Sequence, residues 1–315
     1  MKSALGLLLG FLATASWGSF YIVGRWLFGE EDGGNINPFL ANLLRFGLAV
    51  ITLSPLLLSK NNRVLVKKAF TKDWGKFLLI ALIGIALEGF FVLYALNFTT
   101  ASRCSLMANC SPIATVILAF FLLREKTSVK GVIGMLIGFA GIILAGTARG
   151  GDIYADTSLR TLIGDGMALI SGFCWAFFTV YGAKVSDEYG GPVSMFVSFL
   201  MGMVLMVPVV LFTATTRDFS VITPRIWCGY IYTGIITLAL ANACWYAALK
   251  YLKPGVLGAF GYLSAAITFT LSAIVLKEKF SPLFITAIVL VLGGMALMMA
   301  NPAKESVSAE SAPGE

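Results

Sequence analysis

Two charged residues, Arg45 and Glu88, lie far inside apolar stretches of the sequence, where a charge is costly and marks a functional candidate. Arg45 is eight residues past Asn37 and Glu88 is nine residues before Asn97, which places both about 12–14 Å from the same end of their helices. The similar depths allow a pair, and two readings stay open. Either the two residues form a structural ion pair, the reading favoured for Arg45, or Glu88 takes up a proton or contacts a substrate.

A second group of polar and aromatic residues stands at matching places in the two halves of the chain. Asn109 and Tyr262 occupy the same point of two similar apolar runs, and Trp17 and Trp175 each stand in the first apolar run of their half. Amide, phenol and indole groups can hydrogen-bond and stack on a small amphipathic molecule, although one aromatic taken alone is more often packing. The predicted substrate-binding residues are Trp17, Glu88, Asn109, Trp175, Asn242, Trp245, Tyr246 and Tyr262.

The residue types that are missing restrict the chemistry further. The 315-residue sequence has no histidine, which excludes histidine-ligated haem, histidine-containing zinc sites and Ser-His-Asp triads. Its five cysteines stand in apolar segments without a CxxC pair, so we interpret them as small core residues rather than as metal ligands. No P-loop and no basic-aromatic nucleic-acid motif is present. We therefore expect no metal, no cofactor, no nucleic-acid partner and no enzymatic activity.

Membrane-spanning helices must position these residues. Hydrophobic residues make up 58% of the chain and charged residues 12%, against about 25% charged in a soluble domain. The N-terminal run resembles a signal peptide, but it continues to Phe28, so we expect a retained first helix. The predicted fold class is an all-α integral membrane protein. Residues 301–315 are predicted to form a disordered cytoplasmic tail. Ten helices are predicted, at 4–27, 38–58, 75–97, 100–123, 129–148, 162–184, 192–213, 226–249, 254–276 and 283–300.

The two halves of the chain repeat one another. The segment LLREKTS (122–128) recurs as VLKEKFS (275–281), at a spacing of 153 residues. Five helices separate the two segments, and because five is odd, equivalent helices must cross the membrane in opposite directions. This predicts two inverted five-helix repeats, 1–150 and 158–300, an arrangement typical of secondary transporters.

Lysine and arginine predict which side faces the cytoplasm. With the N-terminus inside, a basic cluster falls on the cytoplasmic side and the acidic loop GEEDGG (29–34) falls opposite it. Both termini are then cytoplasmic, while Glu125 faces the cytoplasm and Glu278 faces the outside. The basic cluster comprises Lys60, Arg63, Lys67, Lys68, Lys72 and Lys76.

Three segments resemble the EamA-like branch of the drug/metabolite transporter superfamily. They are PFLANLLRFGLAV (38–50), ALNFTTASRCSLMANCSPIATVILAFFLLREKTS (95–128) and ALKYLKPGVLGAFGYLSAAITFTLSAIVLKEKFS (248–281), and the resemblance covers about 1–300. It implies ten helices in two EamA repeats, and export or exchange of small metabolites across a bacterial or archaeal plasma membrane. One departure concerns the proline kink of the fourth helix, since Pro112 is matched by Ala265 in the ninth.

Together these features predict a secondary active or facilitative transporter that exports small metabolites, such as amino acids, by alternating access. The alternative is a nucleotide-sugar or phosphorylated-metabolite antiporter, whose cargo favours lysine and arginine in the cavity helices; the eighth and ninth helices have none between their ends. The expected partners are a small-molecule substrate and the lipid bilayer. Glycines in the fifth helix allow a homodimer, but packing within one chain is the favoured reading. They are Gly131, Gly134, Gly138 and Gly141.

Overall fold

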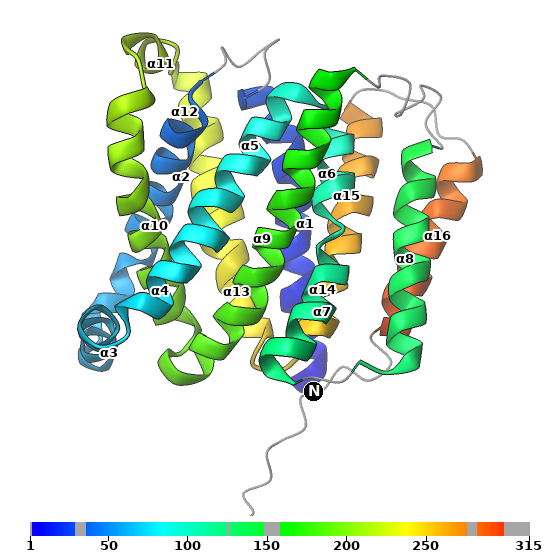
Figure 1. The fold of residues 1–315 in the computed structure, drawn as a ribbon, viewed down its shortest axis with the longest axis horizontal. Coiled ribbons are helices and arrows are strands. Elements are labelled where there is room, and N and C mark those ends of the chain that lie inside the picture. The colour runs from blue at the N-terminus through cyan, green and yellow to red at the C-terminus, as the bar shows by residue number, and fades with distance from the viewer. Residues whose placement is uncertain (1, 29–35, 125–126, 148–157, 276–281, 299–315) are drawn as a thin grey trace, which may run out of the picture.

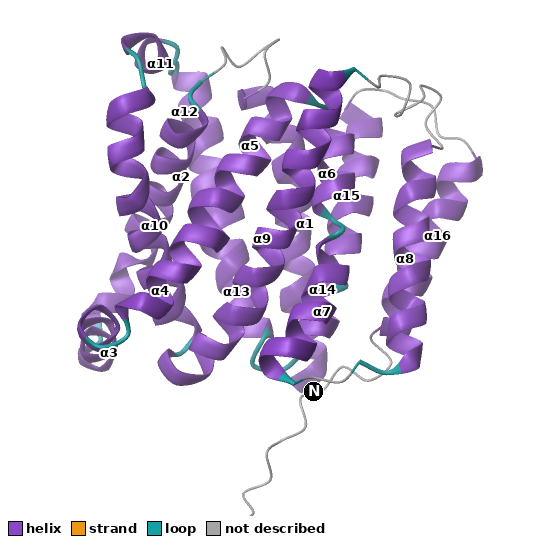
Figure 2. Ribbon diagram, in the orientation of Figure 1, coloured by secondary structure: helices purple, strands orange, loops and turns teal. Residues whose placement is uncertain are grey.

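The computed structural model describes residues 2–28, 36–124, 127–147, 158–275 and 282–298. Every regular element in these ranges is a helix, and the helices stand side by side as one bundle (Figures 1 and 2). Eight helical stretches are long and apolar enough to cross a membrane, and the apolar helices Val129–Leu144 and Ile285–Met298 are shorter. The prediction of an all-helical membrane protein is therefore confirmed, whereas ten crossings stay a prediction.

The helices of the first half follow the predicted ranges with breaks inside several of them. They are α1 (Lys2–Phe28), α2 (Pro38–Leu53), η1 (Ser54–Leu58), α3 (Lys60–Thr71), α4 (Trp74–Ala81), η2 (Leu82–Leu87), α5 (Glu88–Phe98), α6 (Ala101–Ala108), α7 (Ser111–Leu123) and α8 (Val129–Thr147).

The second half has the same sequence of long spans. Its helices are α9 (Leu159–Tyr189), α10 (Gly191–Thr213), α11 (Thr216–Ser220), α12 (Pro224–Ile231), η3 (Tyr232–Leu240), α13 (Ala241–Ala248), α14 (Pro254–Gly258), α15 (Phe260–Val275) and α16 (Pro282–Met298). Glu125, Glu278 and the tail at 301–315 lie outside the described residues, so the predictions made for them stay predictions.

One span in each half widens into a π-helix partway along its length. The span α4–η2–α5 contains η2, and the span α12–η3–α13 contains η3. A π-helical turn inside an α-helix is rare and frequently lies at a functional site. Glu88 follows η2 directly, and Asn242 follows η3 after one residue. The two widened segments therefore stand immediately before two of the predicted site residues.

Two further spans are interrupted, and the interruptions face each other. The first span breaks at Asn109, just before Pro112, which lacks the amide donor that a continuous helix needs. The other breaks between α14 and α15, although no proline marks that point. A Cβ on Gly261 would lie 3.2 Å from the Asn109 Oδ1, and one on Gly258 would lie 3.0 Å from Thr115. Small residues thus let the two broken helices cross closely.

The ninth predicted helix therefore breaks even though Ala265 replaces the proline of the fourth. Its break lies on the N-terminal side of the matched position, near the contact that Gly258 makes with α7. The position of proline predicts only the first break, where a backbone donor is missing. The second break coincides with close helix packing instead.

The glycines of α8 pack within the chain. A Cβ on Gly134 would lie 2.6 Å from the Gly294 carbonyl of α16, and one on Gly141 would lie 2.8 Å from the Val291 amide. Figure 1 shows α8 and α16 side by side at one edge of the bundle. A homodimer through α8 stays a prediction, but Gly134 and Gly141 are covered by α16.

Candidate functional site

A cavity of about 90 Å³, the central cavity, lies between α1, α2, α5, the α6–α7 break, α9, η3, α13 and α15. About 10–15 Å³ of such space holds one water molecule, so in this conformation the cavity has room for several. Its lining comes in equal parts from the two halves of the chain. Seven residues singled out in the sequence line it: Trp17, Arg45, Glu88, Asn109, Trp175, Asn242 and Trp245.

Three indole rings form one wall of the central cavity. The ring centroid of Trp17 lies 4.7 Å from that of Trp175 and 4.9 Å from that of Trp245, both in edge-on geometry. The Trp17 Nε1 donates a hydrogen bond of 2.8 Å to the Thr237 carbonyl, inside η3. This hydrogen bond holds the Trp17 ring of the aromatic wall against the π-helical segment η3. Such rings offer a flat apolar surface with fixed orientation.

Arg45 and Glu88 both line the cavity but form no ion pair among the contacts that the structure describes. The Arg45 Nη1 donates to the Asn42 Oδ1 at 3.1 Å, and its guanidinium carbon lies 4.5 Å from the centre of the Phe20 ring. The Arg45 Nε is buried without a hydrogen-bond partner. Asn42 and Phe20 thus contact the guanidinium in this conformation, and the ion pair with Glu88 stays a prediction. The Arg45 guanidinium and the Glu88 carboxylate therefore border the same central cavity.

Asn109 stands at the break between α6 and α7. Its Nδ2 donates to the Ser105 carbonyl at 2.7 Å, so the side chain closes the end of α6. Ser111, the first residue of α7, lines the cavity, as does Gly261 near the start of α15. The first amides of a helix lack partners within it and carry partial positive charge. Two helix starts therefore border the cavity at this point.

Two predicted site residues do not line the central cavity. The Tyr262 hydroxyl donates to the Met135 carbonyl at 3.0 Å, and the Tyr262 ring lies against Gly138 of α8. Tyr246 packs edge-on against Phe178 and lines a second cavity, described below. Asn109 and Tyr262 match in sequence, yet only Asn109 reaches the central cavity.

Sequence reasoning missed several polar residues of the lining. Tyr21 follows Trp17 by four residues and Ser171 precedes Trp175 by four, so each shares a helix face with a residue that was found. That spacing was a usable signal. Thr237 and Ser264 also line the cavity, and nothing in their sequence context separates them from ordinary helix hydroxyls.

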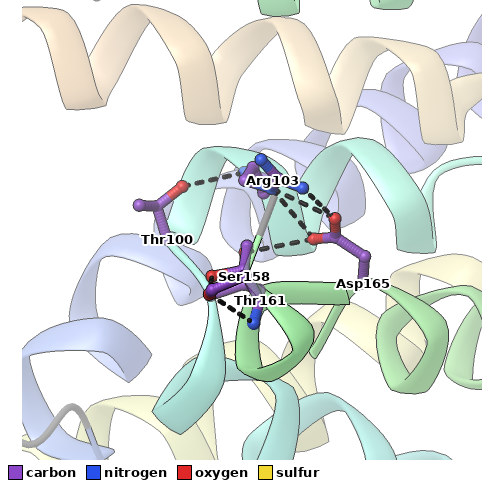
Figure 3. A network of polar contacts seen from close by, with 6 residues as sticks. Thr100, Arg103, Ser158, Thr161 and Asp165 are labelled. Atoms are coloured by element: carbon purple, nitrogen blue, oxygen red, sulfur yellow. Dashed lines mark hydrogen bonds and ion pairs between the residues drawn. The ribbon is translucent and has the colours of Figure 1, made fainter. Parts of the chain in front are cut away.

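A buried ion pair between Arg103 and Asp165 was also missed (Figure 3). The Arg103 Nε lies 3.1 Å from each carboxylate oxygen of Asp165, and the Nη2 donates to the same carboxylate. Thr99 adds a hydrogen bond of 3.1 Å to Asp165. The pair ties α6 of the first half to α9 of the second. A single aspartate in an apolar span was the signal, and its partner 62 residues away was not visible in the sequence.

The EamA-like transporter family model matches the chain twice, over residues 4–147 and 162–300. The uncharacterized transporter YetK of Bacillus subtilis is 30% identical over 286 residues, covering 90% of this chain and 83% of that protein. An uncharacterized transporter of Archaeoglobus fulgidus is 27% identical over 284 residues, covering 88% and 93%. The riboflavin transporter ImpX of Fusobacterium nucleatum is 26% identical over 261 residues, covering 80% and 83%.

A solved crystal structure shares the fold. It superposes with a TM-score of 0.73 over 93% of this chain and 95% of its own, at 20% sequence identity.

Proposed function

The chain belongs to the EamA-like transporter family of membrane proteins, and from that premise we propose that it exports small amphipathic metabolites such as amino acids. The proposal includes secondary active or facilitative transport by alternating access. The observation that carries it is the central cavity, because both family-model matches contribute to one lining between two broken helices. A site shared by two repeats can open to each side in turn.

The chemistry of the lining favours a zwitterion. Arg45 keeps an unpartnered Nε, and Ser111 and Gly261, near the starts of α7 and α15, line the same cavity, so a cargo carboxylate has partners on this side. Glu88 offers the complementary charge to an ammonium group. The three indoles offer an apolar wall for the rest of the molecule. An amino acid with an apolar side chain has all three features.

Ten membrane crossings in two inverted repeats, 1–150 and 158–300, are part of this proposal. Support comes from the double family match and from the paired features of the two halves. Each half has one span with a π-helical segment and one interrupted span.

A nucleotide-sugar or phosphorylated-metabolite antiporter is the alternative. Two or more phosphate charges favour several cations in the site. Of the described lining residues, Arg45 alone carries a positive charge. This alternative is therefore less favoured than the zwitterion.

Uptake into proteoliposomes tests the cargo. The screen covers amino acids, riboflavin and nucleotide sugars, each with and without a pH gradient, against protein-free liposomes. Counterflow of amino acids above the protein-free level supports the proposal. Transport of nucleotide sugars alone would favour the antiporter. Transport of riboflavin alone would indicate that the cargo is a flat heterocycle that binds at the indole wall. If all three classes fail in folded protein, the metabolite proposal is wrong.

Residence in the plasma membrane with both termini in the cytoplasm is also proposed. Figure 1 places α3 and α11 at opposite ends of the bundle. Single cysteines at Lys67 in α3 and Arg217 in α11, in a cysteine-free background, should react with an impermeant thiol reagent from opposite sides, with Lys67→Cys cytoplasmic. Reaction of both from the same side would contradict this topology.

A further inference from the structure

Buried polar atoms without a hydrogen-bond partner gather where α9, α10 and α13 meet. Each side chain in this group is less than one-tenth exposed. Their unpartnered atoms are three hydroxyls of serine and threonine, one phenol, one indole nitrogen and one amide oxygen. We name this group the polar seam; its members are Thr179, Ser194, Ser198, Asn242, Trp245 and Tyr246.

Glycines of α9 and α10 contact Tyr246, and the hydroxyl residues of the polar seam lie on the same helix faces as those glycines. A Cβ on Gly182 would collide with the Tyr246 hydroxyl, and Thr179 lies three residues before Gly182, on the same face of α9. A Cβ on Gly191 would lie 3.0 Å from the Tyr246 Cβ, and Ser194 and Ser198 follow on that face of α10. Both neighbouring helices therefore carry these hydroxyl residues on the face that contacts Tyr246 of α13.

The polar seam joins two cavities. Asn242 and Trp245 line the central cavity, and so does Glu88. Tyr246, four residues past Asn242 and next to Trp245 on α13, lines the second cavity, which has a volume of about 280 Å³. Lys250 and residues of η1 line that second cavity too, at the α3 end of the bundle.

A polar seam without water would destabilise the folded protein. A buried polar group without a partner has lost its hydrogen bonds to water and gained none in the protein, and six such groups share this interface. Buried water commonly satisfies such groups, with two to four polar neighbours for each molecule. A metal ion is a poorer occupant, because hard cations prefer carboxylate oxygens and the polar seam contains no acidic residue.

We propose that the polar seam holds a chain of ordered water molecules that carries protons between the second cavity and Glu88. Each water or hydroxyl accepts one proton and releases one, and the last proton converts the Glu88 carboxylate to the neutral acid. Among the described residues, the titratable groups that interact with Glu88 are Arg45 on α2, Tyr21 on α1 and Cys174 on α9, and Lys250 lies beside the second cavity. The coupling of this step to cargo rests on the proposed function; the water chain does not.

Radiolytic hydroxyl-radical footprinting of the purified protein tests for the water. Ordered water next to a buried side chain promotes its oxidation, so Tyr246 should be modified several-fold faster than Tyr262. Tyr262 is the matched control because it is equally buried and its hydroxyl is bonded to the Met135 carbonyl. Equal rates for the two tyrosines would overturn the water chain.

Infrared-detected deuterium exchange of the Glu88 carboxyl tests for the proton route. At acidic pH the carboxyl band is assigned by its loss in Glu88→Gln, and its exchange in D₂O is timed. Tyr246→Phe and the double variant Ser194→Ala/Ser198→Ala should each slow exchange several-fold. Ser272→Ala should leave it unchanged, since Ser272 is equally buried and unpartnered but lies on α15, outside the polar seam.

Exchange at the wild-type rate in both seam variants would mean that protons reach Glu88 by another route, and would refute the proposal. Neither measurement uses a cargo, so a failed transport screen leaves both results intact.

Discussion

Two arginines in the described part of the chain are buried to the same extent, and their surroundings differ. Arg103 and Arg45 are each 4% exposed. Arg103 meets the Asp165 carboxylate through its Nε and Nη2. Arg45 has one hydrogen bond to an amide, an aromatic ring beside it and an unpartnered Nε next to the central cavity.

We interpret this difference as that between a charge satisfied within the protein and a charge available to a ligand. A buried guanidinium with a carboxylate partner is satisfied within the protein, and removing that partner strands it. A guanidinium that faces a cavity with spare donors keeps them for another molecule. Arg103 therefore joins α6 to α9, and we propose that Arg45 serves the cargo site.

Asp165→Ala should have the largest effect on stability. It leaves the Arg103 charge buried and unpaired, at a cost of about 3–5 kcal/mol. Equilibrium unfolding in mixed detergent measures the loss. The double variant Arg103→Met/Asp165→Leu should recover most of it, because neither charge then remains. A wild-type unfolding curve for Asp165→Ala would show that the pair is not structural.

Arg45→Gln should weaken cargo binding while leaving unfolding nearly unchanged. A hydrogen bond to a charged group contributes about 1.5–3 kcal/mol, so the dissociation constant should rise about tenfold to 100-fold. Binding of the amino acid identified in the screen, measured by calorimetry, gives the affinity. The reverse pattern, lower stability with intact affinity, would make Arg45 structural like Arg103.

Asn109→Ala and Tyr262→Phe should have smaller effects of opposite kinds. Asn109 reaches the central cavity, so its loss should lower affinity by about 1–3 kcal/mol. Tyr262→Phe removes only the bond to the Met135 carbonyl, so stability should fall by about 1 kcal/mol with unchanged affinity. Thermal melts with and without cargo distinguish them. If cargo no longer raised the melting temperature of Tyr262→Phe, Tyr262 would belong to the cargo site.

The smallest effect is expected at the membrane surface, where Asp73 accepts a hydrogen bond from Tyr189. That bond, with a second from Lys76, lowers the pKa of the Asp73 carboxyl below its ordinary value. A carboxyl with a lowered pKa contributes stability above its ordinary value of about 3.9 and loses it as the pH falls through the lowered value. Tyr189→Phe should reduce this acid-dependent loss. Melting temperatures of both proteins between neutral pH and about pH 3 measure it; identical slopes would show that the bond has no effect.

Much of the cavity could be predicted from local sequence. Arg45 and Glu88 stand out because charges are rare in apolar spans, and counting helical residues gives their similar depths. Trp17 and Trp175 were found because the halves repeat. Tyr262 shows the limit of that argument, since a matched position in sequence led to a different neighbour in space.

The sequence by itself determined that the chain is an all-helical membrane protein, where its long apolar spans lie and which charges they contain. These properties depend on composition and on spacing within one helix, which are local. The tertiary structure alone decided that Arg103 pairs with Asp165, that Arg45 donates to Asn42, and that α16 covers Gly134 and Gly141 of α8. Those outcomes depend on which helices pack together and on how each helix is rotated about its axis. Helices far apart in the sequence meet through complementary shape and close packing, which no local sequence pattern encodes.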